Sequence, residues 1–141
     1  MVFPFKTIVN SEDETRFIAE NFAESIKSGE IIAISGNLGT GKTFFVKSIA
    51  KCFDITNVTS PTFAIVNTYN GKLKINHFDF YRIKKLEELY DIGFEEYLFD
   101  NSSITIIEWA EMFEEILPEN IFRIEISYLG NSKREIIINK K

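Results

Sequence analysis

A segment of eight residues matches the phosphate-binding pattern G-x-x-x-x-G-K-[ST] without a substitution. It consists of Gly36, Asn37, Leu38, Gly39, Thr40, Gly41, Lys42 and Thr43. Glycines allow successive backbone N–H groups to turn inward around a phosphate, because a Cβ would block that close approach. The Lys42 ammonium would then reach the β and γ phosphates, and the Thr43 hydroxyl would face the Mg²⁺ bound to them. The segment therefore predicts a nucleotide-binding site.

Such a site needs a buried strand before the glycine-rich segment and a helix after it. Residues 30–35 form a short apolar run without alternation, which is typical of a parallel strand that is covered on both faces. After the segment, Phe45, Ile49 and Phe53 recur four apart, which predicts an amphipathic helix over 42–53. A glycine-rich turn between two core elements is the alternative, and the full match in this setting argues against it.

An acidic residue ends the second apolar run of the chain. Glu108 closes residues 103–108, and a carboxylate there could hold Mg²⁺ directly or through water. Ligands of open α/β sheets collect beyond the carboxyl ends of the strands, where the glycine-rich segment also lies. Thr43 and Glu108 are therefore the predicted metal ligands, and a solvated acid at a strand end is the alternative. Glu111, one helical turn further on, could support this site or lie on the surface.

A second group of polar residues follows the strand-like run that ends near residue 80. Asp79 and Arg82 could position water and balance phosphate charge, since phosphoryl transfer depends on positioning and electrostatics. The alternative is an ion pair between Asp79 and Arg82 at a loop. His77 is the only histidine, and a single histidine in a strand pattern is more often structural than catalytic.

Two further residues could line the site. Thr62 lies on the connection that follows the helix at 42–53, a region where a threonine often senses the γ-phosphate. Trp109 directly follows the predicted metal ligand Glu108. Its indole either packs in the core or lines the site or a partner surface.

The remaining elements must position these residues. A strand is expected at 6–9, and a helix begins at Ser11, which forms a capping-box pattern with Glu14. Asn70 and Gly71 separate two strand-like runs, which is a strong hairpin signal. Further on we expect two short helices within 84–98, a helix from about 110 to 116, and a last antiparallel hairpin over 122–128 and 134–139.

Length and composition favour one domain. The chain has 141 residues, of which 45% are hydrophobic, so a substantial core can be buried. A formal net charge of −5 without a Lys/Arg-rich block argues against tight autonomous nucleic-acid binding. The single cysteine, Cys52, is expected to be buried in the helix at 42–53 and excludes an internal disulfide. No signal peptide or membrane-spanning run is present, so we expect a cytoplasmic protein.

Five ordered motifs resemble those of the TsaE (YjeE) family, small P-loop ATPases of bacterial tRNA threonylcarbamoyladenosine (t6A) biosynthesis. They lie at residues 36–43, 60–63, 77–82, 93–98 and 107–111. Through these motifs the resemblance extends over nearly the whole length of the chain. Only the first motif is generic to P-loop proteins, so the combination is specific. The resemblance implies an α/β fold of the P-loop NTPase class, with a central mainly parallel sheet, antiparallel hairpins, and helices on both faces.

The resemblance also implies ligands and partners. ATP and Mg²⁺ would be the cofactors, and TsaB and TsaD the protein partners, with tRNA reached only through their complex. ATP hydrolysis, slow in the isolated monomer, would keep TsaD transferring threonylcarbamoyl to adenosine 37 of tRNAs that read codons starting with A. The residues that the resemblance places at the site are Lys42, Thr43, Thr62, Asp79, Glu108, Trp109 and, more weakly, Ser11.

Other functional classes stay open on the sequence alone. A small-molecule kinase also combines a P-loop with an Asp–Arg pair, but only three arginines precede Arg134, which leaves little material for an arginine-rich lid. A regulatory GTPase would need an Asn-Lys-x-Asp segment to read guanine, and the chain has none. A nucleotide-dependent scaffold with incidental hydrolysis is the third alternative.

Overall fold

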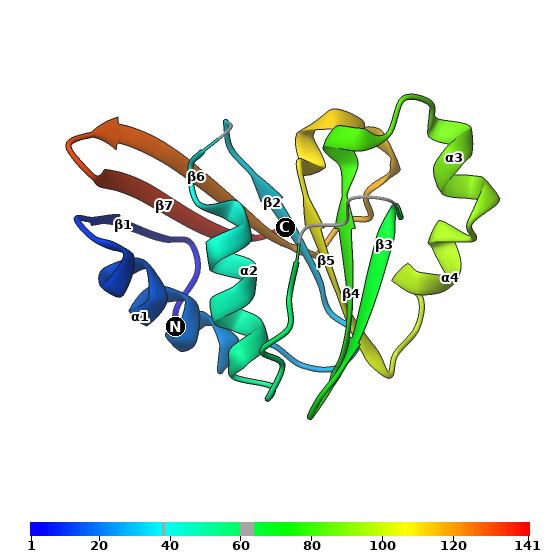
Figure 1. Cartoon of the computed structure of the whole chain (residues 1–141), viewed down its shortest axis with the longest axis horizontal. Coiled ribbons are helices and arrows are strands. Elements are labelled where there is room, and N and C mark those ends of the chain that lie inside the picture. The colour runs from blue at the N-terminus through cyan, green and yellow to red at the C-terminus, as the bar shows by residue number, and fades with distance from the viewer. Residues whose placement is uncertain (38, 60–63) are drawn as a thin grey trace.

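The computed structural model of the chain describes residues 1–37, 39–59 and 64–141. Within them, seven strands form one sheet in the order β1-β7-β6-β2-β5-β4-β3 (Figure 1). The strands are β1 (Phe5–Val9), β2 (Ile31–Ser35), β3 (Val66–Asn70), β4 (Lys74–Asp79), β5 (Ser103–Glu108), β6 (Phe122–Gly130) and β7 (Lys133–Lys140). The helices are α1 (Glu12–Ala23), α2 (Lys42–Lys51), α3 (Leu86–Asp91) and α4 (Phe94–Leu98), with 3₁₀ segments η1 (Phe80–Arg82) and η2 (Ala110–Ile116).

Parallel strands make up the centre of the sheet. β2 lies between β5 and β6 and runs parallel to both, and β4 runs parallel to β5. The outer pairs, β1 with β7, β7 with β6, and β3 with β4, are antiparallel. The predicted mainly parallel centre with antiparallel hairpins is therefore confirmed, including the hairpin at Asn70 and Gly71.

Helices cover both faces of the sheet (Figure 1). Alternate residues of β2 enter two different cores, which explains why its sequence is apolar without alternation. Ile32 and Ile34 join the core under α1 and α2, whereas Ile31 and Ala33 join the core under α3, α4 and η2. Aromatic rings fill much of both cores, and the fully buried ones are Phe22, Phe45, Phe78, Phe80 and Phe94.

The predicted elements are present, with two departures. Helix α2 ends at Lys51 and does not continue to residue 53. The N–H groups of Cys52, Phe53 and Asp54 bond to carbonyl oxygens three residues earlier, as in tight turns. Cys52 is exposed at the end of this helix, so the prediction that it is buried was wrong. The second departure is η2, a 3₁₀ segment instead of an α-helix, since Phe113 has non-helical torsions (φ −139°, ψ 54°).

The carboxyl ends of β2, β4 and β5 lie at one edge of the sheet, and α2 begins there. Asp79 and Glu108 are register partners on neighbouring parallel strands, and Glu108 also pairs with Ile34 of β2. This edge is where ligands bind in open α/β sheets. Among the helices that the described residues form, none is both long and apolar enough to cross a membrane.

Candidate functional site

The glycine-rich loop connects β2 to α2. Gly36 lies so close to β6 that a Cβ would stand 2.5 Å from the Ile126 carbonyl oxygen, a separation that real side chains do not tolerate. Gly41, with φ +101°, precedes α2 in the left-handed region, where a Cβ is unfavourable. Gly41 supplies no side-chain cap to α2, and the beginning of a helix is a favourable place for an anion. Leu38 lies outside the described residues.

Lys42 is folded back onto this loop. Its Nζ donates hydrogen bonds to the carbonyl oxygens of Gly36 and Asn37, at 2.5 and 2.8 Å. The same Nζ lies 4.0 Å from the centroid of the Trp109 ring, a cation–π distance. Burial lowers the pKa of the Lys42 ammonium, and the nearby carboxylates of Glu111, Glu108 and Asp79 act in the opposite direction. The Lys42 ammonium therefore lies beside the loop in a largely desolvated position.

Thr43 and Glu108 are in direct contact. The Thr43 hydroxyl donates to Oε1 of Glu108 at 2.8 Å, and Glu108 is only 2% exposed. The first turn of α2 and the end of β5 thus place a hydroxyl and a carboxylate side by side, as hard oxygen ligands of Mg²⁺ would be. The two residues predicted as metal ligands are brought together by the structure.

His77 completes this group from β4. Its Nε2 lies 2.6 Å from Oε2 of Glu108, and the ring is completely buried. From the sequence we expected a structural histidine, and its contact with Glu108 was not predicted. The sequence did indicate that His77 lies on the same face of the sheet as the site, because His77 and Asp79 are two residues apart on one strand.

Asp79 lies next to Glu108 at the end of β4. Its Oδ1 accepts a hydrogen bond from the Tyr81 backbone N–H at 3.0 Å, so Asp79 caps η1. Burial raises the pKa of the Asp79 carboxyl, and the charge of Glu108 raises it further. The bond from Tyr81 and the charges of His77 and Arg82 oppose this rise. Arg82 itself is exposed, and within the described part of the chain no ion pair joins it to Asp79.

Trp109 forms one wall of the site. It adopts left-handed torsions (φ 57°, ψ 39°) immediately after β5, which turns the chain sharply at Glu108. Its ring lies 4.7 Å from that of Tyr81, centroid to centroid, with Lys42 against it. The sequence left two interpretations open, core or site, and the structure places the indole against the loop lysine.

Two residues from outside the glycine-rich loop contact its backbone. Arg134, at the start of β7, donates from Nε to the Thr40 carbonyl at 2.8 Å. Glu111 accepts a hydrogen bond from the Gly36 N–H at 3.1 Å, so its side chain lies at the loop and not free in solvent. The sequence predicted that Glu111 either supports the site or lies on the surface, whereas no local pattern marks Arg134, which is 94 positions from Thr40.

One predicted site residue, Ser11, is not brought into this group. Ser11 caps α1, and its Oγ accepts a hydrogen bond from the Glu14 N–H at 3.2 Å. Among the described residues, its hydrogen bonds go to its own helix. Ser11 follows β1, which ends at the same edge of the sheet as β2. Thr62 lies outside the described residues.

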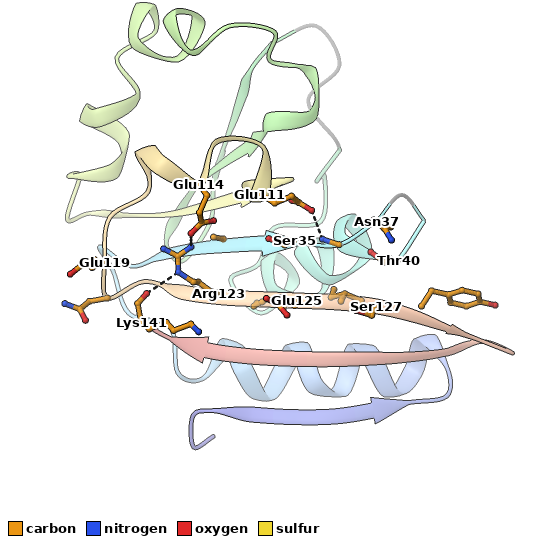
Figure 2. A pocket seen from close by; sticks show the side chains of 16 residues that line it. Ser35, Asn37, Thr40, Glu111, Glu114, Glu119, Arg123, Glu125, Ser127 and Lys141 are labelled. Carbon is orange, nitrogen blue, oxygen red and sulfur yellow. Dashed lines mark hydrogen bonds and ion pairs between the residues drawn. The ribbon is translucent and has the colours of Figure 1, made fainter.

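A groove of about 1160 Å³ runs from the loop along β6 (Figure 2). Ser35, Asn37 and Thr40 line one end of the groove, and residues of β6 and η2 line its length. Its charged side chains are Glu111, Glu114, Glu119, Glu125, Arg123 and Lys141, and Arg123 pairs with Glu114. The excess of carboxylates makes the groove unfavourable for phosphates, which leaves the Lys42 side of the loop for them.

Comparisons with known proteins agree with this architecture. Residues 9–136 match the family model "Threonylcarbamoyl adenosine biosynthesis protein TsaE". The chain is similar to proteins named tRNA threonylcarbamoyladenosine biosynthesis protein TsaE. With the one from Rickettsia conorii it shares 41% identity, covering 94% of this chain and 78% of that protein. With the one from Bacillus subtilis it shares 42% identity, covering 91% of this chain and 80% of that protein.

A solved structure gives the same result for the fold. The crystal structure of YdiB from Bacillus subtilis superposes with a TM-score of 0.79 and 32% sequence identity, covering 100% of this chain and 88% of that one. The family model and these relatives each cover most of the chain. The chain belongs to the TsaE family.

Proposed function

We propose that this protein is a Mg²⁺-dependent ATPase that acts in threonylcarbamoyl modification of adenosine 37 in tRNAs reading ANN codons. The observation that carries the proposal is the convergence of Lys42, Thr43 and Glu108 beside the glycine-rich loop. The relatives' names supply the pathway. In this proposal the whole chain works as one P-loop ATPase domain in the cytoplasm.

Phosphates would bind to the loop amides, the first turn of α2 and Lys42. In the structure Lys42 bonds two carbonyls of its own loop, so its ammonium must move only a short way to exchange these acceptors for phosphate oxygens. Asn37, Gly39, Thr40 and Gly41 contribute backbone to the same loop. Arg82 is exposed beside Asp79 and would add positive charge near the γ-phosphate.

Mg²⁺ would be held by Thr43 and Glu108. Their oxygens are the right type for this ion and already share one hydrogen bond. The described residues contain no group of three His, Cys, Asp or Glu that could hold a metal alone, which fits an ion that arrives with the nucleotide phosphates. When bound, Mg²⁺ would neutralise charge on the phosphates during transfer.

Asp79 is the proposed positioning group for water. It stands beside Glu108, is 9% exposed, and is oriented by its bond from the Tyr81 N–H. Trp109 would exclude solvent on the Lys42 side, and Thr62 would respond to the γ-phosphate. Ser11, at the start of α1, would be a weaker contact to the nucleotide.

The partners in this proposal are TsaB and TsaD, and the isolated chain is a monomer. A net charge of −5 disfavours direct binding of tRNA, so tRNA would be reached through the complex. Loops near Thr62 and Asp79 could present a nucleotide-dependent surface to these partners.

The test measures phosphate release from ATP by the purified chain, with and without TsaB and TsaD, and with Lys42→Ala as the inactive reference. We expect slow, Mg²⁺-dependent release that rises with the partners and weak tRNA binding by the chain alone at physiological salt. Phosphate transferred to an added metabolite would instead favour a kinase. Release that equals that of Lys42→Ala under every condition would refute the ATPase.

A further inference from the structure

His77 is a fully buried polar residue of the sheet that reaches the site from β4. Its ring has no exposed surface, and its Nε2 lies 2.6 Å from Oε2 of Glu108. His77 and Asp79 flank Phe78 on the strand and share the face toward α2, whereas Phe78 faces the opposite core. The imidazole therefore lies directly behind the carboxylate.

The direction of this hydrogen bond follows from the chemistry of the pair. An ionised carboxylate can only accept, and in that state of Glu108 the proton of the bond is carried by Nε2 of His77. The other nitrogen, Nδ1, is buried and has no hydrogen-bond partner among the described residues. Glu108 is thus the only hydrogen-bonding partner that the described part of the chain offers to the His77 side chain.

The two oxygens of Glu108 are divided between two neighbours. Oε2 faces His77 at 2.6 Å, and Oε1 accepts from the Thr43 hydroxyl at 2.8 Å. Because each oxygen has its own donor, the carboxylate cannot rotate without breaking both bonds. Only Oε1 stays on the side of the glycine-rich loop.

We propose that His77 is a positioning residue, which fixes the Glu108 carboxylate so that Oε1 faces Thr43 and the Mg²⁺ of the bound nucleotide. This inference rests on the proposed function, since it concerns the same site. Partners that hydrogen-bond a ligating carboxylate commonly change metal affinity by about 10- to 100-fold when they are removed. Among the described residues, no hydrogen bond joins His77 to Lys42 or to the loop carbonyls that hold it, so nucleotide binding without metal should not depend on His77.

A purely structural role explains the geometry less well. Ile75, two residues earlier on the same face, fills its core position without polar atoms. Burying a histidine nitrogen without a hydrogen-bond partner costs free energy. A functional contact made by the other nitrogen would account for a histidine at this position. The nearest aromatic contact is Tyr69, whose ring centroid is 6.2 Å away, and it forms no hydrogen bond with His77 among the described residues.

The test compares His77→Gln with His77→Asn in the full chain. A glutamine amide can place its N–H close to the position of Nε2, whereas an asparagine amide lies nearer that of Nδ1 and cannot reach Glu108. Asn76→Ala is the matched control, because Asn76 is buried on the same strand and bonds to Ser103 of β5, away from Glu108. Binding of a fluorescent ADP analogue is titrated with Mg²⁺ and repeated in EDTA.

We expect His77→Asn to raise the half-saturating Mg²⁺ concentration by about tenfold or more. His77→Gln and Asn76→Ala should stay close to the parent, and all four proteins should bind the analogue equally in EDTA. In a Glu108→Gln background, His77→Asn should cause no further rise. If His77→Asn does not fold, His77→Met replaces it, with the same expectation.

The inference is overturned if His77→Asn needs no more Mg²⁺ than the parent, or if its affinity in EDTA falls by the same factor. A parent protein that does not bind the analogue with either Mg²⁺ or EDTA would instead refute the proposed function itself. The two failures are therefore distinguishable.

Discussion

The guanidinium of Arg134 contacts the glycine-rich loop, because its Nε donates a hydrogen bond to the carbonyl oxygen of Thr40 at 2.8 Å. Its charged group also lies 5.3 Å from the centroid of the Tyr128 ring, across the β6–β7 hairpin. The last hairpin of the chain therefore supports the loop that follows β2.

Removing this support should weaken nucleotide binding. A hydrogen bond from a charged group contributes about 1.5–3 kcal/mol, so Arg134→Ala should lower the affinity for ADP by about tenfold or more. Lysine cannot reproduce the Nε geometry, so Arg134→Lys should restore little. Calorimetric titration measures both, and Lys133→Ala, an exposed neighbour of equal charge, serves as the control. Equal affinities in all three variants would contradict this role.

Lys42→Ala should abolish ATP turnover while some nucleotide binding survives. The backbone amides of the loop remain, but the charge that meets the β and γ phosphates is lost. We expect affinity to fall by about 10- to 100-fold, in line with loss of one charge-assisted bond, and turnover to fall further. Phosphate release and equilibrium binding give the two numbers, and Lys47→Ala, exposed on the same helix, controls for helix charge. Unchanged turnover would exclude Lys42 from phosphate binding.

Glu108→Gln should act through Mg²⁺ and not through folding. The substitution keeps the shape and removes a buried charge, so the thermal midpoint should stay near that of the parent. The Mg²⁺ concentration needed for hydrolysis should rise, or activity should disappear. Thermal unfolding and a Mg²⁺ titration of phosphate release test this, with Glu125→Gln in the groove as the control. A fully active variant with the parent's Mg²⁺ requirement would show that Glu108 holds no metal.

Asp79→Asn should make the protein more stable at neutral pH and inactive. Burial raises the pKa of the Asp79 carboxyl in the folded protein above its ordinary value of 3.8, so the folded state binds more protons than the unfolded state between these two pKa values. The parent therefore loses stability as pH rises through this window, whereas asparagine stays neutral and can still cap η1. The pH-dependent part of this stability difference should disappear as pH falls below the ordinary pKa of 3.8, where the unfolded state also takes up the proton.

This prediction is checked by measuring the thermal midpoints of the parent and Asp79→Asn between pH 3.5 and 8. ATP turnover of both proteins is measured at pH 7.5. Asp91→Asn, at the exposed end of α3, should show no comparable stabilisation. A parent that is more stable than Asp79→Asn at neutral pH would show that the carboxylate is net favourable where it stands.

Nucleotide binding should change the fluorescence of the single tryptophan. Trp109 is the only indole in the chain, and Lys42 Nζ lies 4.0 Å from its ring. When Lys42 moves to phosphate, the charge over the ring moves too, so emission should shift on addition of ATP. Lys42→Ala should abolish most of the shift, whereas Lys47→Ala should keep it. An emission spectrum that ATP leaves unchanged in the parent would show that Lys42 keeps its position.

Sequence patterns predicted the β2–loop–α2 unit and the location of Thr43 and Glu108 at one site. The first follows from glycine conformation and apolar periodicity, and the second from the rule that parallel strands end at one edge. The contact between Arg134 and Thr40 could not be predicted in this way, because the residues are 94 positions apart and meet only through the pairing of β7 with β6.

His77 and Cys52 show two different limits of sequence-based prediction. The sequence predicted that His77 is a structural residue of a strand, but its partner depends on the β4–β5 register, which pairs His77 with Ile106 and Asp79 with Glu108. Cys52 was assigned to the apolar side of α2, and the helix ends one residue before it. Helix ends depend on a few weak local interactions and are harder to place than helix interiors.

The register between β4 and β5 also bears on which insertions and deletions the chain can tolerate. Asp79 and Glu108 occupy the same rung of adjacent parallel strands. Deleting one residue within β4 would turn its side chains over and bring a phenylalanine to the place of Asp79, while extra residues in the connection between 83 and 102 would leave the rung intact. Descendants of this gene should therefore vary in length in that connection long before either strand gains or loses a residue.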